Sequence, residues 1–227
     1  MYNNIGIDST LNWKRIKKLL TIGLVASCIA FVADWILGYG NPNASLAGIE
    51  WKLSCYTKND FMIFLSGVLG LIGISIEGLS YFGIYRLMAE KSAHLAHIYR
   101  TGIFGYMMFG ACGCHVSCCA LLYVYHHTSF DIALQFAKYF VLPSTIFFII
   151  FFIILCYGQI KAFCTGMTPY PKWCWIFSLP VGMALAMLVK VLGNHPVVNA
   201  ITCGWISVGN IWMFTGLLLM MKRVKKS

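Results

Sequence analysis

Of the ionisable side chains that lie inside long apolar runs of the sequence, four are best placed to do chemistry. They are Asp34, Glu77, His115 and Lys190. An ionisable group in hydrocarbon costs at least about 2.5–3.5 kcal/mol on insertion scales, so it normally faces a partner or a cavity. His115 with Glu77 or Asp34 could carry out general acid–base chemistry. Alternatively, Asp34 and Lys190 could form an ion pair that only fixes the register of two helices.

The depth of each group follows from the rise of about 1.5 Å per helical residue. His115 and Asn210 lie near the middle of their runs, and Glu77 lies roughly 6 Å towards the cytoplasmic side. Asp34 lies roughly 8 Å and Lys190 about 10 Å towards the outer side. We therefore expect an outward-facing polar pocket, with the ligand or pocket candidates Asp34, Glu77, His115, Lys190, His195, Asn199 and Asn210. The alternative is a set of interhelical hydrogen bonds, for which Asn is a common residue.

The densest unusual stretch is residues 112–119, with the sequence Cys-Gly-Cys-His-Val-Ser-Cys-Cys. On an α-helix Cys112, His115 and Cys119 share one face, and Cys114 and Cys118 share another. Thiolates with an imidazole suit zinc, copper(I) or redox chemistry. However, one helix does not surround a tetrahedral ion, and thiols in apolar surroundings are mostly inert. We expect no metal and no cofactor, although the sequence leaves metal binding by this stretch open.

Six apolar runs must position these groups, at about residues 19–38, 61–85, 102–125, 134–158, 173–193 and 198–221. Each is close to the roughly 20 residues that span about 30 Å of hydrocarbon as a helix. The sequence therefore predicts an all-α fold, a polytopic membrane helix bundle with six transmembrane helices. The connections leave no room for a soluble domain, so we expect a single transmembrane domain over residues 1–227.

Basic residues are distributed unevenly around the six runs. Thirteen of the 17 Lys and Arg lie before the first run, after the last, or between runs two and three and runs four and five. Basic residues are enriched in cytoplasmic connections. This pattern predicts that the N- and C-termini are cytoplasmic and that the chain is a multi-pass protein of the cell membrane.

Composition supports a membrane protein independently. The chain is 59% apolar and 11% charged, with a mean hydropathy of +0.76, whereas about a quarter of a soluble domain is charged. The net charge of +10 would fit nucleic acid in a soluble protein, but here basic residues lie at helix ends, near anionic headgroups. We expect membrane lipids and a small-molecule ligand as partners, and no nucleic acid. The sequence indicates no particular protein partner.

The apolar runs differ in their surfaces. Two of them are rich in small residues, with Gly67, Gly70, Gly73 and Gly78 in the second run and Gly102, Gly105, Gly110 and Gly113 in the third. Small residues let helix backbones approach closely in a membrane, so these two runs are predicted to be inner helices. Residues 146–155 consist only of Ile, Phe and Leu, and an all-apolar helix at this position is expected to face lipid.

Several short motifs together resemble a family of uncharacterised six-span bacterial integral membrane proteins. They are Asp34-Trp35-Ile36-Leu37-Gly38, Tyr85-Arg86 after the glycine-rich run, the mid-membrane His115, and Asn199 with Gly209-Asn210. The resemblance covers nearly the whole chain and implies the same topology, but it brings no activity. Membrane hydrolases of the alkaline ceramidase and progestin-receptor kind match less well, because they have seven spans and a late pair of His, where this chain has only His195.

The sequence alone therefore favours a transporter-like or ligand-sensing module with an outward-facing polar pocket. One alternative is a membrane-embedded, hydrolase-like enzyme that uses His115 with Glu77 or Asp34. Another is a structural subunit of a membrane complex. The sequence indicates no substrate and no oligomeric state, and it does not decide whether the chain is an enzyme.

Overall fold

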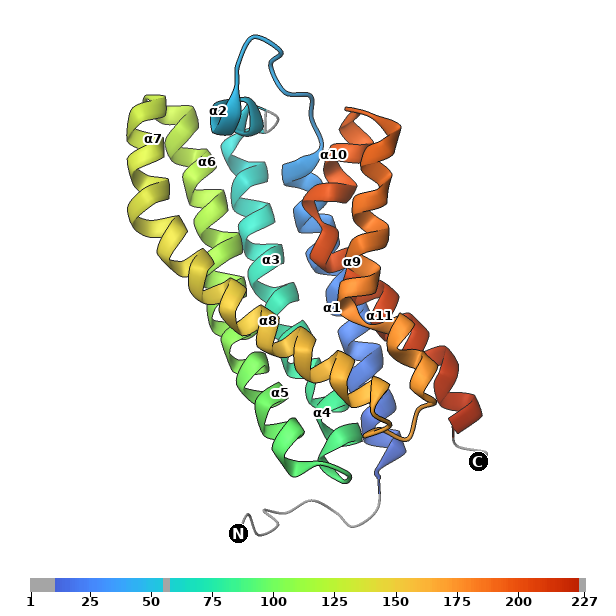
Figure 1. The fold of residues 1–227 in the computed structure, drawn as a ribbon. Coiled ribbons are helices and arrows are strands. Elements are labelled where there is room, and N and C mark those ends of the chain that lie inside the picture. Colours follow the sequence, from blue (N-terminus) through green and yellow to red (C-terminus); the bar gives the residue numbers. More distant parts are fainter. Residues whose placement is uncertain (1–10, 55–57, 225–227) are drawn as a thin grey trace.

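The computed structural model describes residues 11–54 and 58–224, and every element in these ranges is helical (Figure 1). This confirms the predicted all-α class. The elements are α1 (Trp13–Gly38), α2 (Gly48–Leu53), α3 (Asp60–Ser80), α4 (Phe82–Ala89), α5 (Ala93–Gly105), the π-helix η1 (Tyr106–Val116), α6 (Ser117–His127), α7 (Phe130–Phe136), the π-helix η2 (Ala137–Val141), α8 (Leu142–Cys164), the 3-10 helix η3 (Lys172–Phe177), α9 (Leu179–Leu188), the 3-10 helix η4 (Val189–Leu192), α10 (Pro196–Cys203) and α11 (Trp205–Val224).

Within the described residues, four continuous helices are long and apolar enough to cross a membrane. They are Trp13–Gly38, Asp60–Ala89, Ala93–His127 and Phe130–Cys164. Each contains one of the first four predicted runs, so helices over these four runs are confirmed. A fifth candidate span exists if α10 and α11, which meet at an angle of 67°, are counted as one.

The last two predicted runs are not single straight helices. Residues 173–193 divide into η3, α9 and η4, and the continuous apolar helix Leu179–Leu192 is shorter than an ordinary span. Pro180 lies in the first turn of α9, and a proline there prevents a helix from continuing through it. Residues 198–221 are interrupted at Gly204. A Cβ atom at Gly204 would lie 3.0 Å from Cβ of Asp34, so α1 packs closely against this break.

The long helices run side by side and give the bundle two distinct ends (Figure 1). At one end, called here the terminal end, α1 begins, α11 ends and α4 turns into α5. The other end, called the α2 end, carries α2, the α6–α7 turn and the start of α10. The most extensive packing is between α1 and α3, between α5 and α8, and between α11 and both α9 and α1.

Glycines allow the closest helix contacts, as the sequence predicted. A Cβ atom at Gly73 of α3 would lie 2.8 Å from the backbone nitrogen of Ala30 in α1. A Cβ atom at Gly102 of α5 would lie 2.6 Å from the backbone nitrogen of Leu155 in α8. Larger side chains at these two positions would push the helix pairs apart, because backbone atoms do not yield as flexible side chains do.

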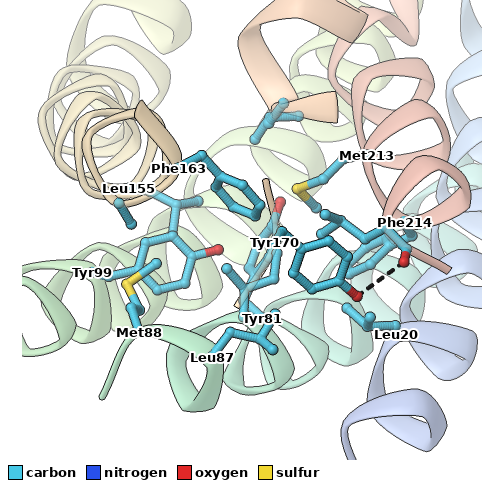
Figure 2. Packing of buried hydrophobic residues seen from close by; sticks show 14 of the residues in the cluster. Leu20, Tyr81, Leu87, Met88, Tyr99, Leu155, Phe163, Tyr170, Met213 and Phe214 are labelled. Atoms are coloured by element: carbon cyan, nitrogen blue, oxygen red, sulfur yellow. Dashed lines mark hydrogen bonds between the residues drawn. The ribbon is translucent and has the colours of Figure 1, made fainter. Parts of the chain in front are cut away.

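Large aromatic side chains fill the half of the bundle nearest the terminal end (Figure 2). Tyr81, Tyr99 and Phe214 are fully buried there. Tyr170 follows α8, and its hydroxyl donates to the backbone oxygen of Leu217 at 3.0 Å. Burial raises the pKa of Tyr170, so the phenol keeps the proton that it donates. The cavity of the candidate site extends towards the α2 end.

The all-apolar part of α8 is exposed on one side only. Phe147 and Ile150 are about half exposed on the outside of the bundle, whereas Phe148 and Leu155 are buried inside it. The predicted lipid-facing helix therefore offers one face to its surroundings and one to α5 and η1. Periodicity gave no sign of this difference, because both faces consist of the same residue types.

Candidate functional site

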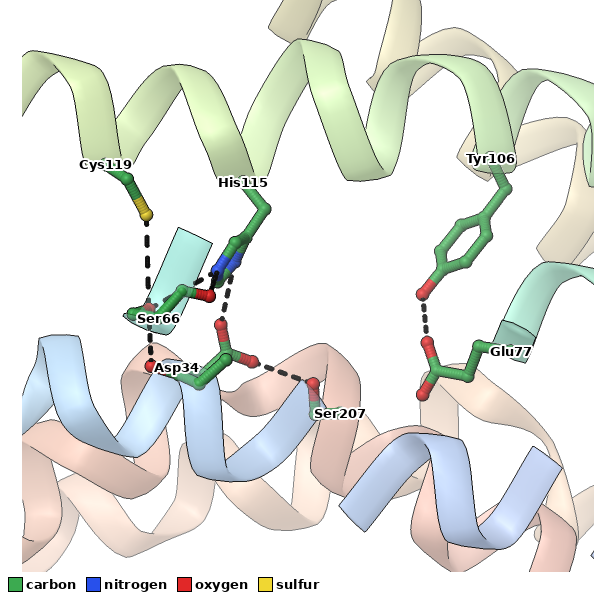
Figure 3. Close-up of polar contacts among 8 residues, drawn as sticks. Asp34, Ser66, Glu77, Tyr106, His115, Cys119 and Ser207 are labelled. Atoms are coloured by element: carbon green, nitrogen blue, oxygen red, sulfur yellow. Dashed lines mark hydrogen bonds and ion pairs between the residues drawn. The ribbon is translucent and has the colours of Figure 1, made fainter. Parts of the chain in front are cut away.

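Asp34 of α1 and His115 of η1 form a largely buried pair where the two helices face one another (Figure 3). His115 Nδ1 lies 3.3 Å from Asp34 Oδ1, and the two side chains are 8% and 15% exposed. The sequence analysis offered Lys190 as the partner of Asp34, and this is wrong. Lys190 lies in η4 with an exposed side chain, because the short α9 brings it to the surface of the bundle.

Both ring nitrogens of His115 face hydrogen-bond acceptors. Nε2 lies 3.1 Å from the backbone oxygen of Ser66, and Nδ1 faces the carboxyl group of Asp34. A carbonyl oxygen only accepts, so Nε2 carries a proton. A second proton lies between Nδ1 and Asp34 Oδ1, on one atom or the other. The pair therefore holds two protons and has no net charge, which suits an interior where an uncompensated charge is costly.

The second oxygen of Asp34 is satisfied from the break between α10 and α11. Ser207 is 4% exposed, and its hydroxyl donates to Asp34 Oδ2 at 2.7 Å. The break at Gly204 lets the first turn of α11 approach α1 closely enough for this contact. Three elements, α1, η1 and α11, thus hold the Asp34 carboxyl in one orientation.

A glycine of α3 provides the space for the His115 ring. A Cβ atom at Gly70 would lie 2.1 Å from both Cδ2 and Nε2 of the imidazole. The ring therefore lies directly against the α3 backbone, where it also reaches the Ser66 carbonyl. Gly70 was predicted only as a residue of close helix packing, and its contact with His115 is more specific.

Asp34, His115 and Ser66 lie next to one another like the acid, base and nucleophile of an acyl-transfer triad. Their contacts do not fit that role. The Ser66 hydroxyl lies 3.5 Å from His115 Nε2 and donates its proton to the backbone oxygen of Ala33 at 2.8 Å. Ser66 is also fully buried between α1 and α3. A nucleophile must reach its substrate and give its proton to the base. This arrangement meets neither condition.

A cavity of about 360 Å³ lies beside the Asp34–His115 pair. Its walls come from α1, α3, η1, α6, α8, α10 and α11, and α2 covers it at one end. Most of the lining is apolar, including Ile74, Leu122, Phe148 and Ile206. The polar lining consists of Asp34, His115, Ser207, Tyr106 and Lys52, with the thiols of Cys114, Cys118 and Cys203. Where the sequence predicted a polar pocket, the structure has a largely apolar cavity with a few polar groups.

Glu77 and Asn210 belong to a second polar cluster around Tyr106, and Figure 3 shows Glu77 with Tyr106. The hydroxyl of Tyr106 donates to Glu77 Oε2 at 2.6 Å, and the Asn210 amide donates to the same hydroxyl at 3.3 Å. The hydroxyl of Tyr81 donates to Asn210 Oδ1 at 2.6 Å. Glu77 and Asn210 are fully buried, and neither lines the cavity. Tyr106 belongs to both features, since it also lines the cavity.

The π-helix η1 brings His115 and Tyr106 to the same side of one helix. Residues nine apart in an α-helix of 3.6 residues per turn are separated by about two and a half turns and face opposite ways. A π-helix has wider turns, closed from residue i to i+5, so nine residues make about two turns. Both side chains are buried, at 8% and 2% exposure, and both point towards α3 (Figure 3). Single π-turns are frequent at functional sites.

The same π-helix directs the cysteine side chains to different faces from those predicted for an α-helix. Cys112 is exposed, whereas His115 and Cys119 are buried, so the predicted common face is wrong. Cys114 and Cys118 both line the cavity, as expected for neighbours on one face. Among the described residues, no group of three or more His, Cys, Asp or Glu side chains is arranged to hold a metal ion.

Two other predicted pocket residues lie away from the cavity. His195 precedes α10 and is exposed. Asn199 donates from Nδ2 to the backbone oxygen of Gly40 at 2.8 Å, a contact that ties α10 to the chain leaving α1. Of the seven candidates, only Asp34 and His115 line the cavity. The sequence analysis did not identify Ser66, Ser207, Tyr106 or Lys52 as site residues. Ser and Tyr are common in apolar helices, and Lys52 belongs to no recognisable motif.

Comparison with known proteins identifies a family but no activity. The model of a family described as "Family of unknown function (DUF6796)" matches residues 1–224, and the chain belongs to this family. No curated protein and no solved structure matches the chain. The match thus confirms the predicted resemblance to an uncharacterised family. The chemistry must therefore be inferred from the site itself.

Proposed function

We propose that the chain is a polytopic protein of a cell membrane, with one transmembrane domain that crosses six times. The four long apolar helices make four crossings, α9 with η4 makes the fifth, and the bent α10–α11 pair makes the sixth. Both termini are then cytoplasmic, which agrees with the uneven distribution of Lys and Arg. Membrane lipids surround the exposed apolar side chains, and the α2 end faces outward.

The proposed activity is reversible binding of a small amphipathic molecule, either for transport or for sensing. The observation that supports it is the cavity of about 360 Å³ beside the buried Asp34–His115 pair. Ligand cavities commonly measure about 300–1,000 Å³ and combine apolar walls with a few fixed polar groups. A cavity at the lower end of this range suits a ligand with a single short chain.

The charges of the lining favour an anionic headgroup. Asp34 and His115 neutralise one another, whereas Lys52 of α2 forms no ion pair with any described residue. Lys52 is exposed and lines the cavity at its α2 end. A carboxylate there would meet an ammonium group while its alkyl chain entered the apolar part. The ligand class is therefore a medium-chain carboxylic acid, with Asp34 and His115 as hydrogen-bonding groups in the wall.

Thermal unfolding in lipid nanodiscs tests this proposal with three probes of equal chain length: decanoate, decanol and decylamine. A ligand at 100 times its Kd stabilises the folded state by about 2.7 kcal/mol. We expect decanoate to stabilise most and decylamine least. Lys52→Gln should abolish the preference for decanoate, whereas the control Lys58→Gln, a lysine outside the cavity lining, should keep it.

Two outcomes would overturn this proposal. Equal shifts with all three probes would show partition into lipid without a charged subsite. No shift with any probe would favour the structural-subunit alternative, and copurification of a partner would then be the next experiment. The hydrolase alternative would regain support only if a decanoyl ester were cleaved by the wild type and not by His115→Gln.

A further inference from the structure

Glu77 is a buried carboxyl group that ligand binding in the cavity does not require. It is fully buried, and it comes from the end of α3. Its Oε2 accepts from the Tyr106 hydroxyl at 2.6 Å, and its Oε1 has no hydrogen-bond partner among the described residues (Figure 3). A buried polar atom without a hydrogen-bond partner destabilises the fold, so its presence needs a physical explanation.

The hydrogen bonds around Glu77 all run towards the carboxyl group. Tyr81 donates to the side-chain oxygen of Asn210, Asn210 donates to the hydroxyl of Tyr106, and Tyr106 donates to Glu77 Oε2. Each hydroxyl has one proton to donate, so Oε2 is already occupied as an acceptor. A proton on this carboxyl group therefore lies on Oε1, the unpartnered atom.

Among the described residues, no positively charged side chain pairs with Glu77. Its neighbours are Tyr106 from η1, Ser27 and Asp34 from α1, and Asn210 from α11, and Tyr81 lies on its own chain segment. Of these, only Asp34 can carry a charge at neutral pH; that charge has the same sign and is balanced by His115 rather than by Glu77. Glu77 forms no ion pair with any described residue. An ionised carboxylate without a partner is very costly in an apolar interior.

Tyr106 connects this carboxyl group to the cavity. Its hydroxyl contacts Glu77, and the residue lines the cavity beside His115. We propose that Glu77 is a proton-binding site that is loaded and emptied from the cavity through the Tyr106 hydroxyl. On release, the carboxyl group rotates so that its proton faces the Tyr106 oxygen, which accepts it while the hydroxyl passes its own proton to a water or another base in the cavity. Tyr106 is unchanged, Glu77 becomes a carboxylate, and the base gains one proton.

This site does not depend on which molecule the cavity binds, so it can be tested without a ligand. The test is infrared spectroscopy of the protein in nanodiscs, with glutamate carrying ¹³C in its side-chain carboxyl. The chain contains only three glutamates, Glu50, Glu77 and Glu90; Glu50 is partly exposed and Glu90 is exposed, so only Glu77 is fully buried. A C=O band of a protonated acid that shifts with ¹³C-glutamate therefore reports Glu77 and excludes Asp34.

We expect such a band in the wild type at pH 7, a shift of the band on transfer to D₂O, and its loss as the pH is raised. The isotope identifies the band without any substitution, so the test does not require Glu77→Gln to fold. Where that variant folds, it should lack the band, and Glu50→Gln and Glu90→Gln should both keep it. Tyr106→Phe should abolish rapid exchange with D₂O. The control Tyr99→Phe removes another fully buried phenol, whose hydroxyl has no hydrogen-bond partner among the described residues, and should exchange like the wild type.

Three results would overturn the inference. The first is the absence of a glutamate-sensitive acid band at all values from about pH 5 to 10, which would mean that Glu77 is ionised throughout. The second is a band that neither exchanges nor titrates, which would identify a sealed structural acid. The third is equally rapid exchange in Tyr106→Phe, which would show that protons reach Glu77 by another route.

Discussion

Gly70→Ala is the substitution that most specifically perturbs the Asp34–His115 pair. The added Cβ would lie 2.1 Å from Nε2 and Cδ2 of the imidazole, so the ring must move. Any movement away from α3 lengthens the contact with the Ser66 carbonyl, now 3.1 Å, and alters the 3.3 Å contact with Asp34. The substitution thus disturbs a buried pair without changing either of its members.

The size of the effect follows from two opposing contributions. Disrupting one side of a buried pair costs about 3–5 kcal/mol, because the other group is left uncompensated. Alanine in place of glycine inside a helix gains about 1 kcal/mol. We therefore expect Gly70→Ala to lower the free energy of unfolding by about 2–4 kcal/mol. The measurement is reversible unfolding in mixed micelles, followed by circular dichroism.

Gly67→Ala is the matched control, three residues earlier in the same helix. Its Cβ would meet only Cys119, at 3.8 Å, so it should be neutral or stabilise by up to about 1 kcal/mol. Combining Gly70→Ala with His115→Ala tests the cause directly. Once the ring is absent, the alanine at position 70 should cost nothing further. The reasoning would be refuted if Gly70→Ala were as stable as Gly67→Ala, or if the two losses in the double variant were additive.

Three further predictions follow from single contacts and from the topology. Ser207→Ala removes the donor to Asp34 Oδ2 and should lower the free energy of unfolding by about 1.5–3 kcal/mol; a change near zero would mean that another group replaces it. Asp60→Asn should change the same quantity by less than about 1 kcal/mol, because the Asp60–His127 pair is 55% and 46% exposed; a larger loss would show that this pair ties α3 to α6. A fluorescent reporter fused after residue 227 should be protected from protease added outside intact cells, and its digestion would contradict the proposed orientation.

The sequence was sufficient to predict the four long helices and to nominate Asp34 and His115. Long apolar runs specify helices that hold their backbone hydrogen bonds internally, and ionisable residues inside such runs are conspicuous. The partner of Asp34 was not predictable in the same way. Lys190 and Asp34 were placed at similar depths, but depth does not tell which way a side chain points around its helix. The short α9 leaves Lys190 at the surface.

The π-helix accounts for most of what the sequence analysis missed around His115. With α-helical spacing, Tyr106 would lie on the opposite side from His115, so it was not considered. The wider turns of η1 bring both to the α3 side and move Cys112 outward. The sequence of residues 106–116 carries no strong signal for a π-helix, since its register is set by packing against α3 and α8. Gly70 likewise looked like one of several packing glycines, and only the position of the imidazole distinguishes it.

The most direct test of the account is whether a carboxylic acid enters the cavity. Trp205 lines it, and bromine on an acyl chain quenches tryptophan fluorescence at contact. Decanoate brominated at its terminal carbon should cause saturable quenching that is lost in Trp205→Phe and in Ile206→Phe, which fills the cavity. The control Leu219→Phe, at a side chain that is 68% exposed, should behave like the wild type. Quenching that rises without saturation and is equal in all four proteins would show partition into lipid alone and would contradict the proposed ligand site.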